Sequence, residues 1–120
     1  MGIQFSSQTP IYLQIIESIK LQIIKGEYKL GQKLPSVREF SVLFEVNPNT
    51  VCKALSELEN DGLIITDRTN GKFVTKDEKI VSILKEETIS KIKKEYFSAM
   101  EKIGVSRAEA LKFLENKESL

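Results

Sequence analysis

Hydrogen-bonding side chains gather at two predicted helix starts between residues 34 and 50. Arg38 lies in the first turn of the earlier helix, and its guanidinium can bond a phosphate or a guanine edge through paired hydrogen bonds. Asn49 and Thr50 open the later helix. An asparagine amide can bond adenine bidentately, and a threonine methyl group can contact thymine. These residue types at this spacing indicate recognition of double-stranded DNA.

The two helices are predicted from the residues at their starts. Ser36 can cap a helix over residues 36–44, with a glutamate three residues later completing a capping box. Asn47 can cap a helix over residues 48–60, whose first position is a proline. Two short capped helices joined by a tight turn are typical of a helix-turn-helix.

Each of these side chains also has a purely structural interpretation. Arg38 can be a solvated arginine paired with a nearby carboxylate, and Asn49 and Thr50 can serve turn geometry alone. Lys53, one turn after Asn49, can contact a phosphate or remain in solvent. We favour DNA contact for Arg38, because a cation at a helix N-terminus opposes the helix dipole, and for Asn49 and Thr50, because the second helix of such motifs reads base edges. For Asn47 the cap is the favoured role.

A β-hairpin is predicted after the second helix. Residues 63–66 and 73–75 are rich in β-forming types, and Gly71 lies in the turn between them. Arg68 and Lys72 flank this turn, where they can reach the minor groove or its phosphates; alternatively, they only keep the hairpin tip soluble. A helix-turn-helix followed by such a hairpin is a winged helix-turn-helix.

An amphipathic helix is predicted before these elements, with Thr9 as its cap, Pro10 at its first position and Gly26 at its end. The helices over 36–44 and 48–60 should bury their own apolar stripes against it. The predicted core residues of those two helices are Val37, Phe40, Leu43, Phe44, Val51, Ala54, Leu55 and Leu58.

Residues 77–103 predict a long helix with apolar residues at spacings of three and four. These residues are Ile89, Ile92, Tyr96, Met100 and Ile103. A capping box at Ser106 opens a last helix. Because the preceding elements already close a small core, we expect the same segment of a second copy to cover this stripe, giving a homodimer. A ligand pocket built from Tyr96, Phe97 and Phe113 is the alternative.

The composition excludes several classes of protein. The chain of 120 residues has a net charge of +1, so contact with nucleic acid must depend on where its cations lie. It contains no histidine and a single cysteine, Cys52, which excludes a Cys/His zinc site and histidine-dependent catalytic triads. No catalytic site, cofactor or metal is predicted. Without a signal peptide or membrane-spanning segment, the chain is expected in the cytoplasm.

The residue pattern from Pro10 to Val74 resembles the GntR family of bacterial transcription regulators, in the form of its YtrA-like subfamily. The residues that carry the resemblance are Pro10-Ile11-Tyr12, Gln14-Ile15, Gly26, Gly31, Leu34-Pro35-Ser36, Arg38-Glu39, Val46-Asn47-Pro48-Asn49-Thr50-Val51, Lys53-Ala54-Leu55, Leu58-Glu59, Gly62-Leu63, Gly71 and Phe73-Val74. The resemblance implies a winged helix domain followed by two dimerisation helices, and a repressor, often of operons that encode membrane transporters.

The resemblance also implies DNA contacts by Arg38, Asn49, Thr50 and the wing around Gly71. The chain departs from the family pattern at three positions. Cys52 replaces an arginine that many members outside this subfamily have, Thr69 replaces a common wing glycine, and Lys72 replaces the usual small hydroxyl residue.

We therefore predict a mainly α fold with a small β-hairpin wing. A winged helix-turn-helix domain over residues 1–76 precedes a helical dimerisation segment over residues 77–120. The predicted function is a sequence-specific regulator of transcription, a repressor that binds an inverted-repeat operator as a homodimer, with an unidentified small-molecule effector left open. The predicted DNA-binding residues are Ser36, Arg38, Asn47, Asn49, Thr50, Lys53, Arg68, Gly71 and Lys72. The rival interpretation, a winged helix used for protein contact, fits these polar and basic residues poorly.

Overall fold

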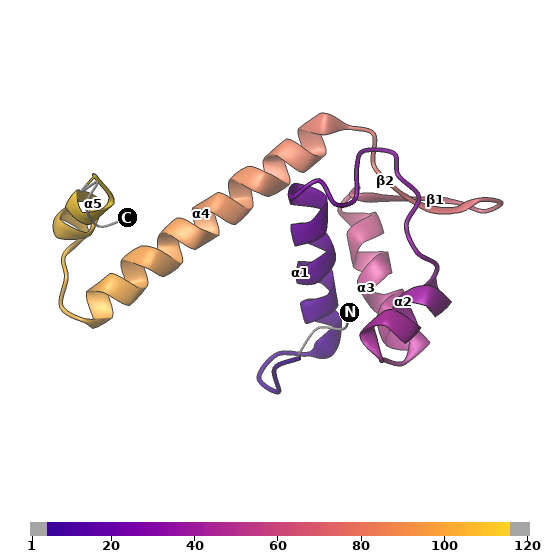
Figure 1. The fold of residues 1–120 in the computed structure, drawn as a ribbon, viewed down its shortest axis with the longest axis horizontal. Helices are drawn as coiled ribbons and strands as arrows, with labels where there is room; N and C mark the ends of the chain where they lie inside the picture. Colours follow the sequence, from indigo (N-terminus) through magenta and orange to yellow (C-terminus); the bar gives the residue numbers. More distant parts are fainter. Residues whose placement is uncertain (1–4, 116–120) are drawn as a thin grey trace. The chain divides into compact units, whose positions relative to one another are not determined.

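The computed structural model describes residues 5–115, which form five helices and a two-stranded hairpin (Figure 1). In chain order the elements are α1 (Ile11–Ile24), α2 (Val37–Phe44), α3 (Pro48–Asn60), β1 (Ile64–Asp67), β2 (Gly71–Val74), α4 (Glu78–Lys102) and α5 (Arg107–Glu115). The predicted fold class, mainly α with a hairpin wing after a helix-turn-helix, is confirmed. The chain divides into two compact units, Met1–Leu84 and Lys85–Leu120, and the boundary between them falls within α4.

The core of the first unit is built from one face of each of its helices. α1 and α3 pack together, and apolar residues at spacings of three and four line their contact. The buried residues of these two helices are Ile15, Ile16, Ile19, Ile23, Val51, Ala54, Leu55 and Leu58. Each large apolar side chain buried here contributes roughly 1.5–3 kcal/mol to folding. The predicted core of α3 is therefore confirmed.

Helix α2 begins as predicted and buries a slightly different face. The Glu39 N–H donates to Ser36 Oγ at 3.1 Å, and the Ser36 N–H donates to Glu39 Oε1 at 2.9 Å, which confirms the capping box. Phe40 and Phe44 are buried and stack with ring centroids 5.6 Å apart. The predicted burial of Leu43 is wrong, because this residue lies roughly 90° around the helix from the buried face and remains 41% exposed.

The start of α1 also differs from the prediction. Pro10, with an extended ψ of 140°, is itself the cap residue, and no side chain caps the helix, so Thr9 is not the cap. The Gln14 side chain instead folds back over this start. Its Nε2 donates to the carbonyls of Thr9 at 2.7 Å and Ser6 at 2.8 Å, and its Oε1 accepts from the Ser6 N–H at 2.8 Å. One glutamine thus holds the chain at Ser6 and Thr9 against the first turn of the helix.

The hairpin is antiparallel, and its register sorts its side chains between two faces. Ile64 pairs with Val74 and Thr66 with Lys72, so these residues share the face on which Ile64 and Val74 are buried. The connector before α2 pairs with the other edge of β2, where the Leu34 N–H donates to the Lys72 carbonyl at 2.8 Å. The wing is therefore held from both sides of β2.

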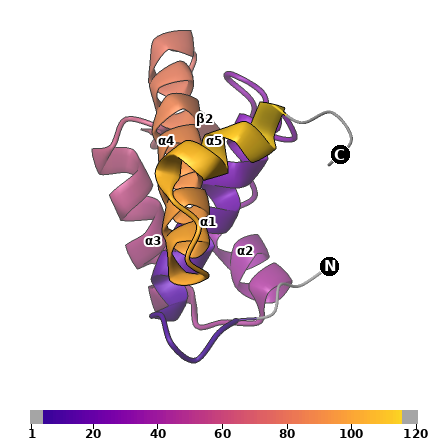
Figure 2. The ribbon, with the colours of Figure 1, turned by 90° about the vertical axis from the view of Figure 1, so that its left-hand side faces the viewer.

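The second unit holds the last part of α4 and α5 (Figure 2). The Tyr96 hydroxyl donates to the Ala110 carbonyl at 2.7 Å, and the Arg107 guanidinium lies 4.2 Å from the Phe97 ring centroid. The predicted capping box at Ser106 is present, because the Glu109 N–H donates to Ser106 Oγ at 3.2 Å. Tyr96 and Phe97 therefore pack against α5. Among the described residues, no helix is long and apolar enough to cross a membrane.

The unit has little buried apolar surface of its own. Tyr96 and Met100 are half-buried, and within the described part of the unit only Ala110 is fully buried. The exposed large apolar residues are Ile89, Ile92, Ile103, Leu111, Phe113 and Leu114. For an ordered pair of helices this is a large unpartnered apolar surface.

Candidate nucleic-acid interface

The start of α3 is fixed by its cap. Asn47 Oδ1 accepts the Asn49 N–H at 2.8 Å, and Pro48 occupies the first turn, so the predicted cap is confirmed. The chain reaches this cap through Glu45, which has a left-handed φ of 56° and ends α2. Asn49 is exposed and Thr50 half-buried. The first turn of α3 therefore presents short polar side chains at an open helix end.

Arg38 lies in the first turn of α2, one residue from the capping glutamate. Hydrogen bonds hold Glu39: its pKa is lowered first by the Ser36 backbone N–H and then by the Ser36 side chain. Within residues 5–115, Arg38 forms no ion pair with Glu39 or Asp61. Its guanidinium is exposed, and both interpretations of Arg38 stay predictions.

Lys53 lies one turn after Asn49 on α3 and contacts a neighbouring helix. Its Nζ is 4.0 Å from the ring centroid of Tyr12 in α1, a cation–π contact worth about 0.5–1 kcal/mol at an exposed site. No sequence pattern predicts this contact, because the two residues are far apart along the chain. The lysine is exposed, and its ammonium is held near α1.

The wing tip carries Arg68 beside a structured turn. Asp67 Oδ1 accepts the N–H groups of Thr69 at 2.9 Å and Asn70 at 3.2 Å, and the pKa of Asp67 is lowered first by the Thr69 bond. Gly71 has a φ of 107°, a conformation that favours glycine. The exposed Arg68 thus lies in a turn that is stabilised by hydrogen bonds to Asp67.

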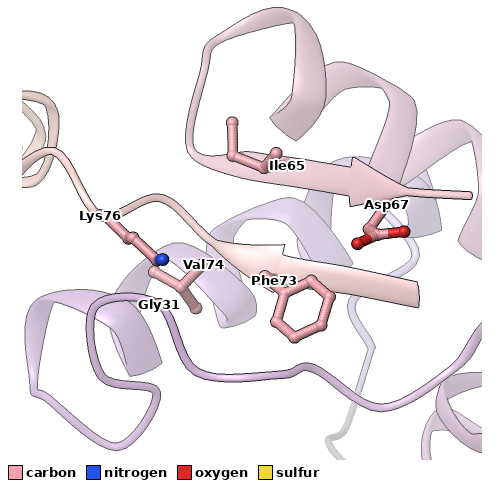
Figure 3. Close-up of a pocket in the computed structure, with 6 residues that line it drawn as sticks. All are labelled: Gly31, Ile65, Asp67, Phe73, Val74 and Lys76. Atoms are coloured by element: carbon pink, nitrogen blue, oxygen red, sulfur yellow. The ribbon is translucent and has the colours of Figure 1, made fainter. Parts of the chain in front are cut away.

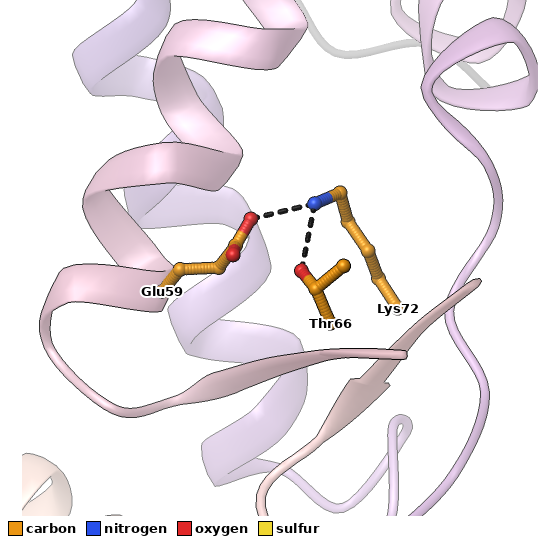
Figure 4. Close-up of polar contacts among 3 residues, drawn as sticks. All are labelled: Glu59, Thr66 and Lys72. Atoms are coloured by element: carbon orange, nitrogen blue, oxygen red, sulfur yellow. Dashed lines mark hydrogen bonds and ion pairs between the residues drawn. The ribbon is translucent and has the colours of Figure 1, made fainter. Parts of the chain in front are cut away.

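Lys72 lies on the inner face of the wing. Its Nζ donates to Glu59 Oε1 at 2.5 Å and to Thr66 Oγ1 at 2.9 Å (Figure 4). The pKa of Glu59 is lowered, chiefly by the hydrogen bond from Lys72, against the effect of its desolvation. Glu59 was not among the predicted site residues. The alternation of the strand could have placed Lys72 on the inner face, since Lys72 precedes the buried Val74 by two residues, but it does not identify Glu59 as its partner.

The outer face of the wing carries an open cleft of about 460 Å³ (Figure 3). The residues that line it are Gly31, Ile65, Asp67, Phe73, Val74 and Lys76. Ile65 and Phe73 are a cross-strand pair, and the charged groups of Asp67 and Lys76 flank them. The two faces of the wing therefore differ: an ion pair lies on the inner face and an apolar cleft on the outer one.

Taken together, α2, α3 and the hairpin define a winged helix-turn-helix of the kind that binds DNA. The family described as "Bacterial regulatory proteins, gntR family" matches residues 11–74, more than half of the sequence. The chain belongs to this family, whose members are transcription regulators and not enzymes, and it is a DNA-binding regulator of transcription.

Two relatives from Bacillus subtilis (strain 168) support the YtrA-like form of the family. The chain is 37% identical over 111 residues to the "Uncharacterized HTH-type transcriptional regulator YhcF", covering 92% of both proteins. It is 49% identical over 73 residues to the "HTH-type transcriptional repressor YtrA", covering 61% of this chain and 56% of that protein.

Solved structures agree with this assignment. A GntR family transcriptional regulator from Listeria monocytogenes is 34% identical with a TM-score of 0.84, over 92% of this chain and 97% of that one. The DNA-binding domain of AraR, solved in complex with operator ORR3, is 32% identical with a TM-score of 0.55, over 62% of this chain and 88% of that one. The fold is thus shared with a protein seen on its operator.

Proposed function

We propose that the chain is a cytoplasmic, homodimeric repressor that binds an inverted-repeat operator. The observation that carries the homodimer is the exposed apolar surface of α4 and α5, because the first unit already has a complete core of its own. On the resemblance to YtrA-like regulators alone, we further propose that the operon it controls encodes a membrane transporter. A small-molecule effector, which the sequence leaves open, is not part of this proposal.

The proposed dimer is formed by the second unit of two copies. Ile89 is 42% exposed, Ile92 58% and Ile103 73%, so each has apolar surface to bury against a partner. Covering such a side chain contributes up to about 1.5–3 kcal/mol, and a two-fold interface uses each residue twice. Met100 and the ring of Tyr96 complete the proposed stripe.

On DNA, the first turn of α3 is proposed to enter the major groove, where Asn49 and Thr50 meet base edges. Arg38 contacts a phosphate or a guanine at the groove edge, and Arg68 approaches the minor groove from the wing tip. Lys53, Ser36, Asn47 and the backbone at Gly71 lie nearer the phosphates. Cationic contacts of this kind make affinity depend steeply on salt.

Selection of bound sequences from random duplex DNA with the full chain tests two things together: the symmetry of the operator and whether the protein binds specific DNA sequences. We expect enrichment of an inverted repeat whose half-sites lie about one helical turn or a multiple apart. Enrichment of a single half-site would argue against the symmetric dimer. No enrichment would favour the rival interpretation, a winged helix that contacts protein.

Transcription in vitro tests the direction of control. A promoter that overlaps the selected site should be transcribed less as the chain is added, and a promoter with a scrambled site should be unaffected. Increased transcription from the intact site would show an activator instead.

A further inference from the structure

The inner face of the wing joins three elements through one ammonium group. Lys72 belongs to β2, Thr66 to β1 and Glu59 to the last turn of α3, and Lys72 Nζ contacts the other two at 2.9 and 2.5 Å (Figure 4). Within residues 5–115, the ion pairs are this one and Lys25–Glu27. Lys25 and Glu27 are neighbours in one turn, so Glu59–Lys72 is the pair that ties separate elements together.

The register of the hairpin leaves Lys72 little choice of direction. Lys72 shares its face with Val74, which is 1% exposed, and it pairs across the strands with Thr66. The side chains of Lys72 and Glu59 are 23% and 31% exposed, so the pair is better shielded from solvent than a surface pair. A cation in this position is directed toward α3.

We propose that Lys72 is a positioning residue, which with Glu59 and Thr66 fixes the wing against α3 instead of contacting phosphate. The inference rests on the proposed DNA interface, in which α3 and the wing tip bind together. A two-stranded hairpin has marginal stability by itself, so its angle depends on what it packs against. The Glu59–Lys72 pair sets the direction in which Arg68 approaches the DNA.

The variant Glu59→Gln separates the two roles by the sign of its effect. If Lys72 contacts phosphate, removing a carboxylate near DNA should leave binding unchanged or strengthen it. If Lys72 positions the wing, the same change should weaken binding, by about threefold to tenfold for a coupled pair of this kind. Glu57→Gln, two residues earlier on the same helix and exposed, is the matched control and should not weaken binding.

The salt dependence of operator binding gives a second readout. Loss of a phosphate contact lowers the slope of log K against log salt by about 0.9. Lys72→Met should weaken binding as much as Glu59→Gln and leave this slope unchanged, while Arg68→Ala should lower it. A reduced slope in Lys72→Met, with full binding by Glu59→Gln, would overturn the proposal.

Exchanging the charges provides a rescue test. In the double variant Glu59→Lys, Lys72→Glu, the Thr66 hydroxyl can donate to the new carboxylate, so the pair can form again. We expect this variant to bind more tightly than either single exchange. A phosphate-contacting residue 72 predicts instead that the double variant binds less tightly than Glu59→Lys alone, because a carboxylate at position 72 repels DNA. Binding no better than that of Lys72→Glu alone would also count against positioning.

Urea unfolding without DNA keeps this inference distinct from the proposed function. A double-mutant cycle on Glu59→Gln and Lys72→Met should show coupling whether or not the chain binds DNA. If the wild-type chain selects no DNA, the proposed function fails even where the coupling is present. If the wild type binds and Glu59→Gln does not weaken it, the positioning role fails and the proposed function stands.

Discussion

Arg38 and Thr50 are the residues whose side chains most directly test DNA recognition. Arg38→Ala and Thr50→Ala should each weaken operator binding by about 1–3 kcal/mol, because each removes a proposed DNA contact and neither side chain is part of the core. Fluorescence anisotropy with labelled operator measures the loss, and thermal unfolding should be nearly unchanged. Asn60→Ala, at the other end of α3, is the control. Full affinity in both the Arg38 and the Thr50 variants would contradict the proposal that the starts of α2 and α3 bind DNA.

The lowered pKa of Glu59 makes stability depend on pH with a definite sign. Its carboxyl is held below the ordinary value of 4.5, so the folded chain binds its proton less readily than the unfolded chain. The stabilisation is therefore full above about pH 4.5 and is lost as the pH falls through the folded pKa. Urea unfolding between pH 7 and pH 3 should show a shallower loss of stability in Glu59→Gln than in the wild type. Parallel curves would contradict this expectation.

At the residue scale, contacts between residues close together in the sequence could be predicted, and contacts between distant residues could not. The caps at Ser36 and Asn47 depend on residues two or three positions apart, so the sequence contains the whole motif. The Glu59–Lys72 pair joins residues thirteen positions apart, and only the tertiary fold brings them together. For the same reason, the contact between Lys53 and Tyr12 was found only in the structure.

The helix-turn-helix depends on the cap of α3, and substitutions at Asn47 can separate capping from DNA contact. Asn47→Ala should lower the free energy of unfolding by about 1 kcal/mol, because the Asn49 N–H loses its acceptor. Asn47→Asp keeps an acceptor at a helix N-terminus and should retain stability, yet bind DNA more weakly through charge repulsion. Urea unfolding and anisotropy distinguish the two. Equal stability of all three proteins would show that the cap contributes nothing.

At the scale of elements, the sequence predicted which helices exist. It was less successful for the start of α1 and for the residues at the border of a buried helix face. The spacing of apolar residues identified α1, and the capping residues at their starts identified α2 and α3. It did not identify Gln14 as the group that closes the start of α1, because that bond depends on how the preceding chain turns. It also assigned Leu43 to the core, since a helix of eight residues has too few turns to define its buried face sharply.

The whole molecule is predicted to be a dimer through α4 and α5. Ile92→Glu should break it, since the side chain is 58% exposed within one protomer and the fold of that protomer can accept a charge there. Sedimentation at micromolar concentration should show a wild-type dimer and an Ile92→Glu monomer. Lys93→Glu, an exposed neighbouring position, is the control and should remain dimeric. A monomeric wild type would contradict the proposed assembly.

At this scale the sequence predicted the class of protein from its first unit alone. The capped helices and the hairpin form a complete core within that unit, so their sequence pattern is enough to indicate the fold without a partner. The second unit has a regular apolar stripe and almost no core, and a stripe predicts that something covers it without specifying what. A second copy of the chain is the proposed partner, because a two-fold dimer covers the stripe without any other protein.

The contact between Lys53 and the ring of Tyr12 has a practical consequence for spectroscopy. The chain contains no tryptophan and three tyrosines, so its near-ultraviolet emission comes from tyrosine. Tyr12 lies against α3, Tyr28 packs on the core of the first unit, and Tyr96 is bonded to α5. These three natural probes report on different parts of the molecule, and comparison with Tyr12→Phe isolates the signal from the contact between α1 and α3, with no dye attached.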